Sequence, residues 1–440
     1  MRMDSKLQLI AGKASEDAKL KFSALVHHIN VQSLARCFRR LKANKSPGID
    51  GVTVAQYGEH LESNLSDLVA RMKAGKYQPQ PVRRVMIPKL WKNEKRMLGI
   101  PAVEDKLVQL VMKEIMESIY EQDFLQFSYG FRPNRSCHTA LDRLDKLIMW
   151  QPINYVVDVD IKGFFDNVSH YWLLKSLEER ISDPQFLLLV RKFLKAGIMQ
   201  GTHWLASNSG TPQGGVISPL LANIYLHYVL DLWFERVFKR GLRGYAEMVR
   251  YCDDFVVCFE MEDEAKRFMD ELKQRLSKFN LEIAASKSSV VEFGRTSWHR
   301  AHRGGGKVST FDFLGFTHYC TKSRRGKFMV GRKTQRRRKS ATLKNMNKWL
   351  KAVRNKMCLK NWWRVFVRKL RGHYTYFGVS GNMRDLQILH RHAECLLFRW
   401  VNRRSQRRSM TWKQFQDYST LNPLPRPKIY YSMYASSGSM

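Results

Sequence analysis

The sequence predicts an α+β protein in which short strands alternate with amphipathic helices, followed by a basic helical region. Two runs, 155–161 and 249–259, combine apolar β-prone residues with Asp, as short strands of a small sheet do. Apolar residues recur every three or four positions through 103–122, which is the period of a helix with one buried face. From about residue 331 the apolar spacing remains helical while Lys and Arg become frequent.

The net charge of the chain favours a polyanionic partner. Lys and Arg total 76 against 39 Asp and Glu, which gives a formal net charge of +37 over 440 residues. This surplus exceeds what solubility requires and predicts binding to nucleic acid. Anionic membrane is the competing partner, but the sequence has no long uncharged apolar run, signal peptide or lipidation motif. We therefore expect nucleic acid and no membrane.

The positive charge is concentrated towards the C-terminus. Residues 331–410 hold 23 Lys or Arg and only two acids, Asp385 and Glu394. Trp and Tyr are interspersed among these basic residues, a pattern that predicts a helical domain gripping nucleic acid. The seven cysteines are scattered without a CxxC pair, so we expect reduced thiols in a cytosolic protein and neither a disulfide framework nor a zinc site.

The most informative run is 249–259, where Asp253 and Asp254 stand side by side between apolar, β-prone residues. A buried unpaired carboxylate costs several kcal/mol, and two adjacent ones also repel each other. Such a pair persists at an exposed turn or beside a cation. The run is therefore either a plain hairpin with Asp-Asp at its tip, or a strand-turn-strand that presents both carboxylates to a divalent metal ion.

A second acidic strand lies at 155–161. Strand alternation puts Asp158 and Asp160 on one face, with apolar residues on the other. Asp160 falls at the end of the strand, where active sites on sheets usually lie, whereas Asp158 lies one pleat deeper and has the character of a structural residue. Asp166 precedes the next helix, and we interpret it as a capping or turn residue.

Three other segments leave alternatives open. Lys89 and Arg96 lie near the two ends of a hairpin expected over 81–101, where they either face a phosphate or are solvated surface charges. The segment 127–135, FSYGFRPNR, suits contact with bases and phosphates but equally a packed loop. The loop 294–310 is rich in Gly, His and Arg, and we expect it to be mobile, with metal binding by its histidines, His299 and His302, less favoured than solvation.

A Gly-rich turn at 210–220, GTPQGGVISPL, opens a long apolar helix and would let a ligand approach the backbone closely. Combined with a strand end bearing Asp160 and a hairpin tip bearing two acids, it suits two-metal phosphoryl transfer. Carboxylate oxygens favour Mg²⁺. Basic residues would receive a triphosphate, and the reaction depends mainly on positioning and charge stabilisation.

Residues from about 45 to 320 resemble a reverse transcriptase, specifically the enzymes encoded within bacterial group II introns. The matching motifs, in order, are SPGIDGVT, RRVMIPK with RMLGIP, QFSYGFRPNRS, DVDIKGFFDNVSH, GTPQGGVISPLLANIYL, VRYCDDFVV, LEIAASKS and FLGF. Downstream, KLRGHYTYFG resembles the thumb and maturase domain of that family. Family members usually have Ala where this chain has Cys252, and the tip between Lys89 and Arg96 is about one residue longer here.

The resemblance implies two Mg²⁺ ions, with Mn²⁺ as a possible substitute, and roles for named residues. The implied metal ligands are Asp160, the carbonyl of Ile161, Asp253 and Asp254. The residues implied at the incoming dNTP are Lys89, Arg96, Phe165 and Gln213. Phe165 would lie against the sugar 2′ position and reject ribonucleotides, and Lys287 would donate a proton to pyrophosphate.

The resemblance also implies a right-hand polymerase: fingers, a palm with a small antiparallel sheet flanked by helices, then an all-α basic thumb. The implied divisions are an N-terminal helical extension (1–43), fingers (44–150), palm (151–325), thumb/maturase domain (326–422) and a C-terminal tail (423–440), which we expect to be a loop or frayed. No paired Cys and His follow the thumb motif, so the chain resembles the endonuclease-lacking branch of the family.

The implied function is RNA-directed DNA synthesis joined to splicing of a group II intron in the bacterial cytoplasm. The implied partners are the intron RNA, an RNA template/DNA primer duplex, target DNA and dNTPs; the oligomeric state does not follow from the resemblance. One alternative is a related, domesticated reverse transcriptase in phage defence or DNA repair, which genomic context would distinguish. Another is an RNA chaperone that only assists splicing, which the intact Asp160, Asp253 and Asp254 argue against.

Overall fold

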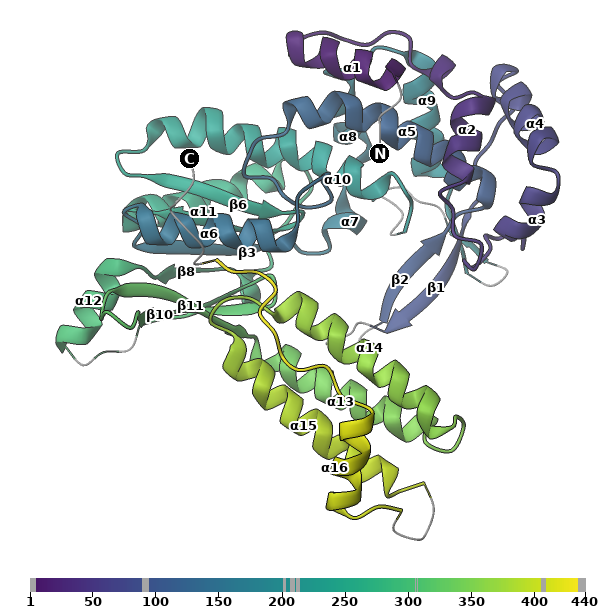
Figure 1. Cartoon of the computed structure of the whole chain (residues 1–440). Coiled ribbons are helices and arrows are strands. Elements are labelled where there is room, and N and C mark those ends of the chain that lie inside the picture. The colour runs from purple at the N-terminus through teal and green to yellow at the C-terminus, as the bar shows by residue number, and fades with distance from the viewer. Residues whose placement is uncertain are drawn as a thin grey trace.

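The computed structural model describes residues 5–88, 95–200, 203–205, 210, 214–304, 306, 308–404 and 409–433. It is a mixed α/β structure in which helices at the N-terminal side, a central sheet and a C-terminal set of helices succeed one another (Figure 1). Among these residues, no helix combines the length and apolar character needed to cross a bilayer.

The first set of α-helices is α1 (Ser5–Glu16), α2 (Val31–Phe38), α3 (Val54–Glu59), α4 (Leu61–Lys73), α5 (Val103–Asp123), α6 (Cys137–Trp150), α7 (Phe164–Asn167) and α8 (His170–Glu178). The second set is α9 (Pro184–Lys195), α10 (Ser218–Leu226), α11 (Glu262–Ser277), α12 (Arg295–Gly304), α13 (Arg336–Val353), α14 (Leu359–Phe377), α15 (Met383–Val401) and α16 (Trp412–Leu421). The strands are β1 (Val82–Pro88), β2 (Lys95–Ile100), β3 (Tyr155–Asp160), β4 (Ile198–Gln200), β5 (His203–Leu205), β6 (Ala246–Tyr251), β7 (Asp254–Phe259), β8 (Ser289–Glu292), β9 (Phe311–Phe313), β10 (Phe316–Lys322) and β11 (Phe328–Thr334).

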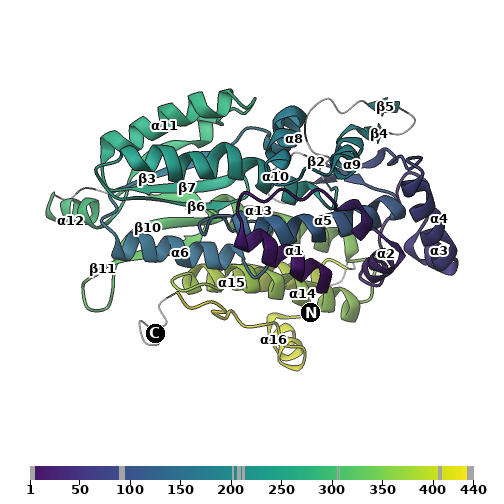
Figure 2. The ribbon, with the colours of Figure 1, turned by 90° about the horizontal axis from the view of Figure 1, so that it is seen from above.

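The central sheet is antiparallel, with strand order β6-β7-β3-β8. Alternation along β3 sends Val157 and Val159 into the core shared with α5, α10 and α11. It sends Val156 into a second core, shared with α6 and the C-terminal helices. Figure 2 shows α11 and α6 on opposite sides of this sheet. Because both faces are covered, the strands predicted at 155–161 and 249–259 are mostly apolar, and Asp158 and Arg250 are the charged residues that lie away from the strand ends.

The predicted hairpin near residues 81–101 is present as β1 and β2, which pair antiparallel from Arg83↔Ile100 to Pro88↔Lys95. β4 adds to β1 in parallel, which gives the sheet order β2-β1-β4-β5. Helices α3 and α4 are separated at His60, whose φ of −124° and ψ of 41° lie outside the helical region. The N-terminal helix α1 packs along α5 (Figure 1).

The C-terminal region is built on β9, β10 and β11, followed by α13 to α16. Helix α14 buries one face, with Trp362, Phe366, Leu370 and Tyr374 each four residues apart and fully enclosed. The expectation that 326–422 is all-α is wrong at its start. β11 pairs with β10 along its whole length, from Phe316↔Thr334 to Lys322↔Phe328.

Two loop predictions also need correction. The segment 294–310 contains helix α12, because Trp298 is buried and packs against Phe328 with ring centroids 5.8 Å apart. The tail expected to be a frayed loop has no helix or strand over 423–433, but it is docked on the protein. The backbone N–H groups of Tyr430 and Tyr431 donate to the carbonyl of Gly378 at 2.7 and 3.0 Å.

Candidate active site

The acidic residues of the two strand runs meet at one end of the central sheet. Asp160, the last residue of β3, is the direct cross-strand partner of Asp254, the first residue of β7. Tyr251 pairs with Asp254 across β6 and β7, so Cys252 and Asp253 form the two-residue turn of the hairpin. The structure therefore brings Asp160, Asp253 and Asp254 into one place, although 93 residues of sequence separate the first from the second.

Negative charges accumulate at this end of the sheet. Burial, followed by the charges of Asp253 and Asp160, raises the pKa of Asp254 to about 7. Burial, followed by the charges of Asp254, Asp312 and Asp160, raises the pKa of Asp158 to about 8. Each carboxylate thus resists ionisation because its neighbours are also acidic and water is partly excluded. A divalent cation would relieve this repulsion.

The donor set therefore suits Mg²⁺ or Mn²⁺, which prefer carboxylate and carbonyl oxygens. Among the described residues, Ile161 and Ile283 are bridge partners that do not hydrogen-bond to each other, which leaves the Ile161 carbonyl outside this pairing. The two flanking hydrogen bonds of that bridge run from Lys162 N–H to the Glu282 carbonyl and from Ala284 N–H to the Asp160 carbonyl, both 2.8 Å. Within the described ranges, however, no three His, Cys, Asp or Glu side chains already converge as a closed metal cage. The metal role of these residues remains a prediction.

Lys287 lies at the same place. It ends a short 3₁₀ turn, Ala285–Lys287, and its Nζ forms an ion pair with Asp160 Oδ2. The next residue, Ser288, accepts a hydrogen bond from the Asp160 backbone N–H through Oγ at 3.2 Å. The ion pair is half-exposed, so Lys287 is available to a ligand that approaches the carboxylates.

Phe165 lies in the short helix α7, just after β3. Its ring is half-buried and meets Phe164 edge-to-face at 5.4 Å. Gly210, the first residue of the Gly-rich turn, has a φ of +83°, and its N–H donates to the Val168 carbonyl at 2.8 Å. A Cβ at Gly210 would lie 2.8 Å from the Phe165 carbonyl oxygen, so only glycine allows this approach.

The far end of the turn lies against the β1–β2 hairpin. A Cβ at Gly214 would lie 2.3 Å from the carbonyl oxygen of Gly99 on β2. The Gly-rich turn therefore starts beside Phe165 and ends beside β2. Arg96 is on β2 opposite Ile87. Lys89 and Gln213 lie outside the described residues.

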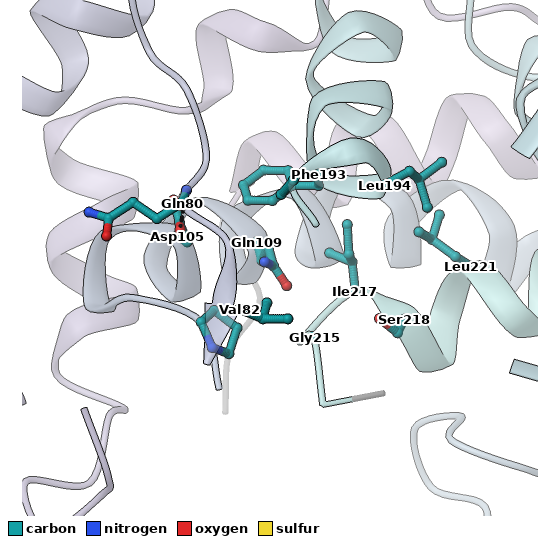
Figure 3. Close-up of a pocket in the computed structure, with 12 residues that line it drawn as sticks. Gln80, Val82, Asp105, Gln109, Phe193, Leu194, Gly215, Ile217, Ser218 and Leu221 are labelled. Atoms are coloured by element: carbon teal, nitrogen blue, oxygen red, sulfur yellow. Dashed lines mark hydrogen bonds between the residues drawn. The ribbon is translucent and has the colours of Figure 1, made fainter. Parts of the chain in front are cut away.

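A small cavity lies behind this turn (Figure 3). Phe193 and Ile217 form part of its apolar wall, and the buried Asp105 and Gln109 supply polar groups. The Val216 N–H donates to Gln109 Oε1 at 2.7 Å, which fixes the turn to helix α5. The cavity lies among core elements and contains none of the predicted site residues.

Other predicted residues take structural places. Asp166 lies within α7, and the N-cap of the next helix is Ser169. The segment 127–135 is largely a packed loop, since Arg132 is buried and donates through Nε to Glu121 Oε2 at 3.0 Å. His299 and His302 are on α12, and they belong to no cluster of three metal-binding side chains in the described ranges.

Sequence reasoning missed several charged residues around the carboxylates. Arg337 and Arg338 lie in the first turn of helix α13. The charge of Arg337 partly offsets the rise in the pKa of Asp158, and the charge of Arg338 partly offsets the rise in the pKa of Asp254. Arg250, the one basic residue of the run 249–259, is buried beneath the turn. A run of basic residues at the start of a helix and a lone Arg in a strand were the available signals.

The family model of reverse transcriptase (RNA-dependent DNA polymerase) matches residues 87–318, slightly more than half of the chain. The chain belongs to the reverse transcriptase family. This confirms the family predicted from the ordered motifs, and the match includes the β3 and β6–β7 carboxylates described above.

Curated relatives of this reverse transcriptase include intron-encoded proteins. The chain is 43% identical over 270 residues to the group II intron-encoded protein LtrA of Lactococcus lactis subsp. cremoris, and the aligned region covers 59% of this chain and 44% of the relative. It is 40% identical over 250 residues to protein YkfC of Escherichia coli strain K12, covering 55% and 64%. It is 36% identical over 208 residues to the putative COX1/OXI3 intron 1 protein of Saccharomyces cerevisiae, covering 47% and 24%. The matches thus span less than two thirds of each relative.

Proposed function

We propose that this reverse transcriptase is an RNA-directed DNA polymerase of the group II intron type. It would bind its intron RNA, assist splicing, and copy the RNA into DNA from a primer at the target site. The observation that carries the polymerase proposal is the cross-strand pairing of Asp160 with Asp254 beside the Asp253 turn. The relatives named as intron-encoded proteins support the intron role.

In this proposal, Asp160, Asp253, Asp254 and the Ile161 carbonyl hold two Mg²⁺ ions, with Mn²⁺ as a substitute. The bound ions would activate the primer 3′ oxygen and stabilise the leaving pyrophosphate. Lys287, which forms an ion pair with Asp160, would give a proton to the pyrophosphate oxygen as it leaves. Phe165 would close the space at the sugar 2′ position.

The remaining assignments follow the same proposal. Arg96 on β2, with Lys89, would meet the triphosphate, and Gln213 would contact the incoming dNTP. We assign 44–150 to the fingers, 151–325 to the palm and 326–422 to the thumb and maturase domain, whose first element is β11. The proximity of the Gly-rich turn to both Phe165 and β2 supports a nucleotide site between palm and fingers.

The test is extension of a DNA primer on an RNA template with dNTPs and Mg²⁺. Asp253→Ala/Asp254→Ala should abolish extension while affinity for intron RNA stays near the wild-type value. A matched control is Asp270→Ala/Glu271→Ala, which removes the same charge from an exposed part of α11. Extension by the Asp253/Asp254 variant at near the wild-type rate would show that the metal assignment is wrong.

A splicing assay separates the intron role from the alternative of a domesticated polymerase. Precursor RNA that contains the proposed group II intron should splice faster with the protein present, and the Asp253/Asp254 variant should retain this effect. Normal primer extension without any stimulation of splicing would instead favour a role in phage defence or repair.

A further inference from the structure

The side chain of Arg250 is buried directly beneath the turn that carries Asp253. It lies on β6, two residues before Cys252, and both Arg250 and its ion-pair partner Asp231 are 0% exposed. A buried guanidinium is costly unless every N–H group finds an acceptor. The acceptors around it are therefore informative about why it is there.

All of the Arg250 N–H groups have acceptors. Nε and one Nη bind both oxygens of Asp231, the first at 2.7 Å. The second Nη donates to Asn223 Oδ1 and to the backbone carbonyl of Cys252, each at 3.1 Å. The first Nη also donates to Ser128 Oγ at 2.7 Å. Arg250 thus connects three parts of the chain: the helix that carries Asn223 and Asp231, the segment that contains Ser128, and the hairpin turn itself.

The helix that supplies two of these acceptors is adapted to the task. Asn223 is on α10, and Asp231 ends the π-helical segment His227–Asp231 that continues it. In a regular α-helix, residues eight apart are rotated by about 80° from one another. A π turn contains more residues per turn, so it brings Asp231 round towards the side from which Asn223 points. Both side chains then reach the same guanidinium.

The other support is the segment that contains Ser128. Arg250 N–H donates to the Phe127 carbonyl, and Tyr129 N–H donates to the Arg250 carbonyl, both at 2.8 Å. At Gly130 an added Cβ would lie 2.4 Å from the backbone nitrogen of Cys252, so this segment packs tightly on the turn. Asn223 Nδ2 also donates to the Gly130 carbonyl at 2.6 Å.

The turn needs such support because its backbone is strained. Cys252 has a φ of 60°, a region that residues other than Gly, Asn and Asp rarely occupy, and it is buried. Its carbonyl orients the peptide that leads to Asp253. We propose that Arg250 is a positioning residue: by binding the Cys252 carbonyl from a rigid base of Asp231, Asn223 and Ser128, it fixes the turn that presents Asp253 and Asp254 to metal. This inference rests on the proposed polymerase function.

The variant that tests the inference removes the buried pair as a unit. Arg250→Met/Asp231→Leu leaves no unpaired buried charge, and replacing such a pair by apolar residues is often neutral for stability or stabilising. It nevertheless deletes the donor to the Cys252 carbonyl. The matched control is Arg180→Met/Asp123→Leu, another largely buried pair, in which Arg180 also donates to backbone carbonyls, of Ala14 and Asp17.

Three quantities are measured for each protein: the melting temperature, its rise on adding Mg²⁺, and the Mg²⁺ dependence of single-nucleotide incorporation. In the Arg250/Asp231 variant we expect a melting temperature near that of the control pair without metal. We also expect a smaller Mg²⁺-induced rise, a several-fold higher half-saturating Mg²⁺ concentration, and incorporation at least ten-fold slower. Equal Mg²⁺ responses in the two double variants would overturn the inference.

If the Arg250/Asp231 variant melts well below the control, Ser128→Ala takes its place, because it removes one acceptor and keeps the ion pair. It should raise the half-saturating Mg²⁺ concentration a few-fold, and an unchanged value would overturn the inference. The thermal readout separates the two proposals. A wild-type protein that shows the Mg²⁺-induced rise without incorporating nucleotides contradicts the polymerase function alone, whereas one that shows neither response contradicts both.

Discussion

Asp160 and Lys287, 127 residues apart in the sequence, form an ion pair at the end of the central sheet. The contact joins the last residue of β3 to the short turn that precedes β8. In the metal-free protein the ammonium therefore neutralises one carboxylate of the cluster. With Mg²⁺ held by the carboxylates, as proposed, Lys287 would serve as the proton donor to the leaving group.

The first prediction concerns this lysine. Lys287→Ala should slow single-nucleotide incorporation by about 10²-fold or more, the usual contribution of a general acid, while primer–template affinity changes little. Pre-steady-state incorporation at several pH values measures the effect. Lys162→Ala is the matched control, since Lys162 forms an exposed ion pair with Glu282 nearby. Equal rates for the two variants would exclude a proton-donating role.

The second prediction follows from the raised pKa of Asp254. The pKa is about 7 in the folded protein and near 3.8 when unfolded, so between these values the native state binds more protons. The metal-free protein therefore loses stability as the pH rises from about 4 to about 7. Asp254→Asn should remove this loss and stabilise the metal-free protein at pH 8, by on the order of 1 kcal/mol.

Urea denaturation in EDTA at pH 8 and pH 4.5 checks this expectation. The stabilisation should be much smaller at pH 4.5 than at pH 8, because the loss starts near the unfolded pKa of 3.8 and is complete only above the folded pKa of about 7. A variant less stable than wild type at pH 8 would show that the carboxylate is well accommodated without metal. The Asp254→Asn variant should also be inactive in primer extension, because the carboxylate that destabilises the protein at this position is the one proposed to bind metal.

The third prediction concerns sugar selection. Phe165→Ala should lower the preference for dNTP over rNTP by about ten-fold or more, since it opens space at the 2′ position. The ratio of kcat/KM for matched dNTP and rNTP measures the change. Phe165→Tyr keeps the bulk of the ring and is the control. Unchanged selectivity in the Ala variant would remove the gating role.

Strand alternation was enough to predict much of this site. The patterns of 155–161 and 249–259 predicted a strand and a hairpin, and the position of Asp160 at a strand end was also evident. Alternation does not determine which strands become neighbours or in what register, because any two amphipathic strands can pair. That Asp160 lies opposite Asp254 depends on the shared cores above and below the sheet, which form only in three dimensions.

Two features escaped sequence reasoning for different reasons. Helix α12 lies in a segment whose Gly, His and Arg content indicates a loop, but the burial of Trp298 against Phe328 stabilises the helix through tertiary contact. Arg250 was visible as an anomaly in its strand. Its partners Asn223 and Asp231 lie on a helix 27 and 19 residues away, and local pattern does not reveal that they converge.

The fourth prediction is a steep salt dependence of RNA binding. The 23 Lys and Arg of residues 331–410 would neutralise several RNA phosphates and release their counterions. The logarithm of the binding constant should therefore fall linearly with the logarithm of the salt concentration. Lys344, Lys348 and Lys351 are exposed on α13 at spacings that place them on one side of the helix. Replacing all three by Ala should reduce the slope by about 2–3.

Fluorescence anisotropy measures this slope between about 50 and 200 mM salt, a range over which a protein that contacts many phosphates loses much of its affinity. Lys266→Ala/Lys273→Ala on α11 is the control, since these lysines are exposed and already paired with acids of the same helix. A flat dependence for the wild-type protein would contradict the assignment of the C-terminal helices to nucleic-acid binding.

The last prediction concerns the docked tail. The Tyr431 ring stacks on His138 at the start of α6, with centroids 3.7 Å apart and planes inclined by 11°. His138 Nε2 is also hydrogen-bonded to the Tyr376 carbonyl of α14 at 2.8 Å, and the Tyr431 backbone pairs with Val379 just beyond that helix. The tail thus contacts both α6, which packs on the central sheet, and the end of α14, and so links these two parts of the protein.

A double-mutant cycle of His138→Ala and Tyr431→Ala should give a coupling energy of about 0.5–1.5 kcal/mol, the range for aromatic pairs. Chemical denaturation of the four proteins supplies the values. Tyr430→Ala in place of Tyr431→Ala is the control, because Tyr430 lies beside Gly378 and makes no ring contact with His138 among the described aromatic pairs. Additive effects of His138→Ala and Tyr431→Ala would mean that the tail rests on the surface without holding the two parts together.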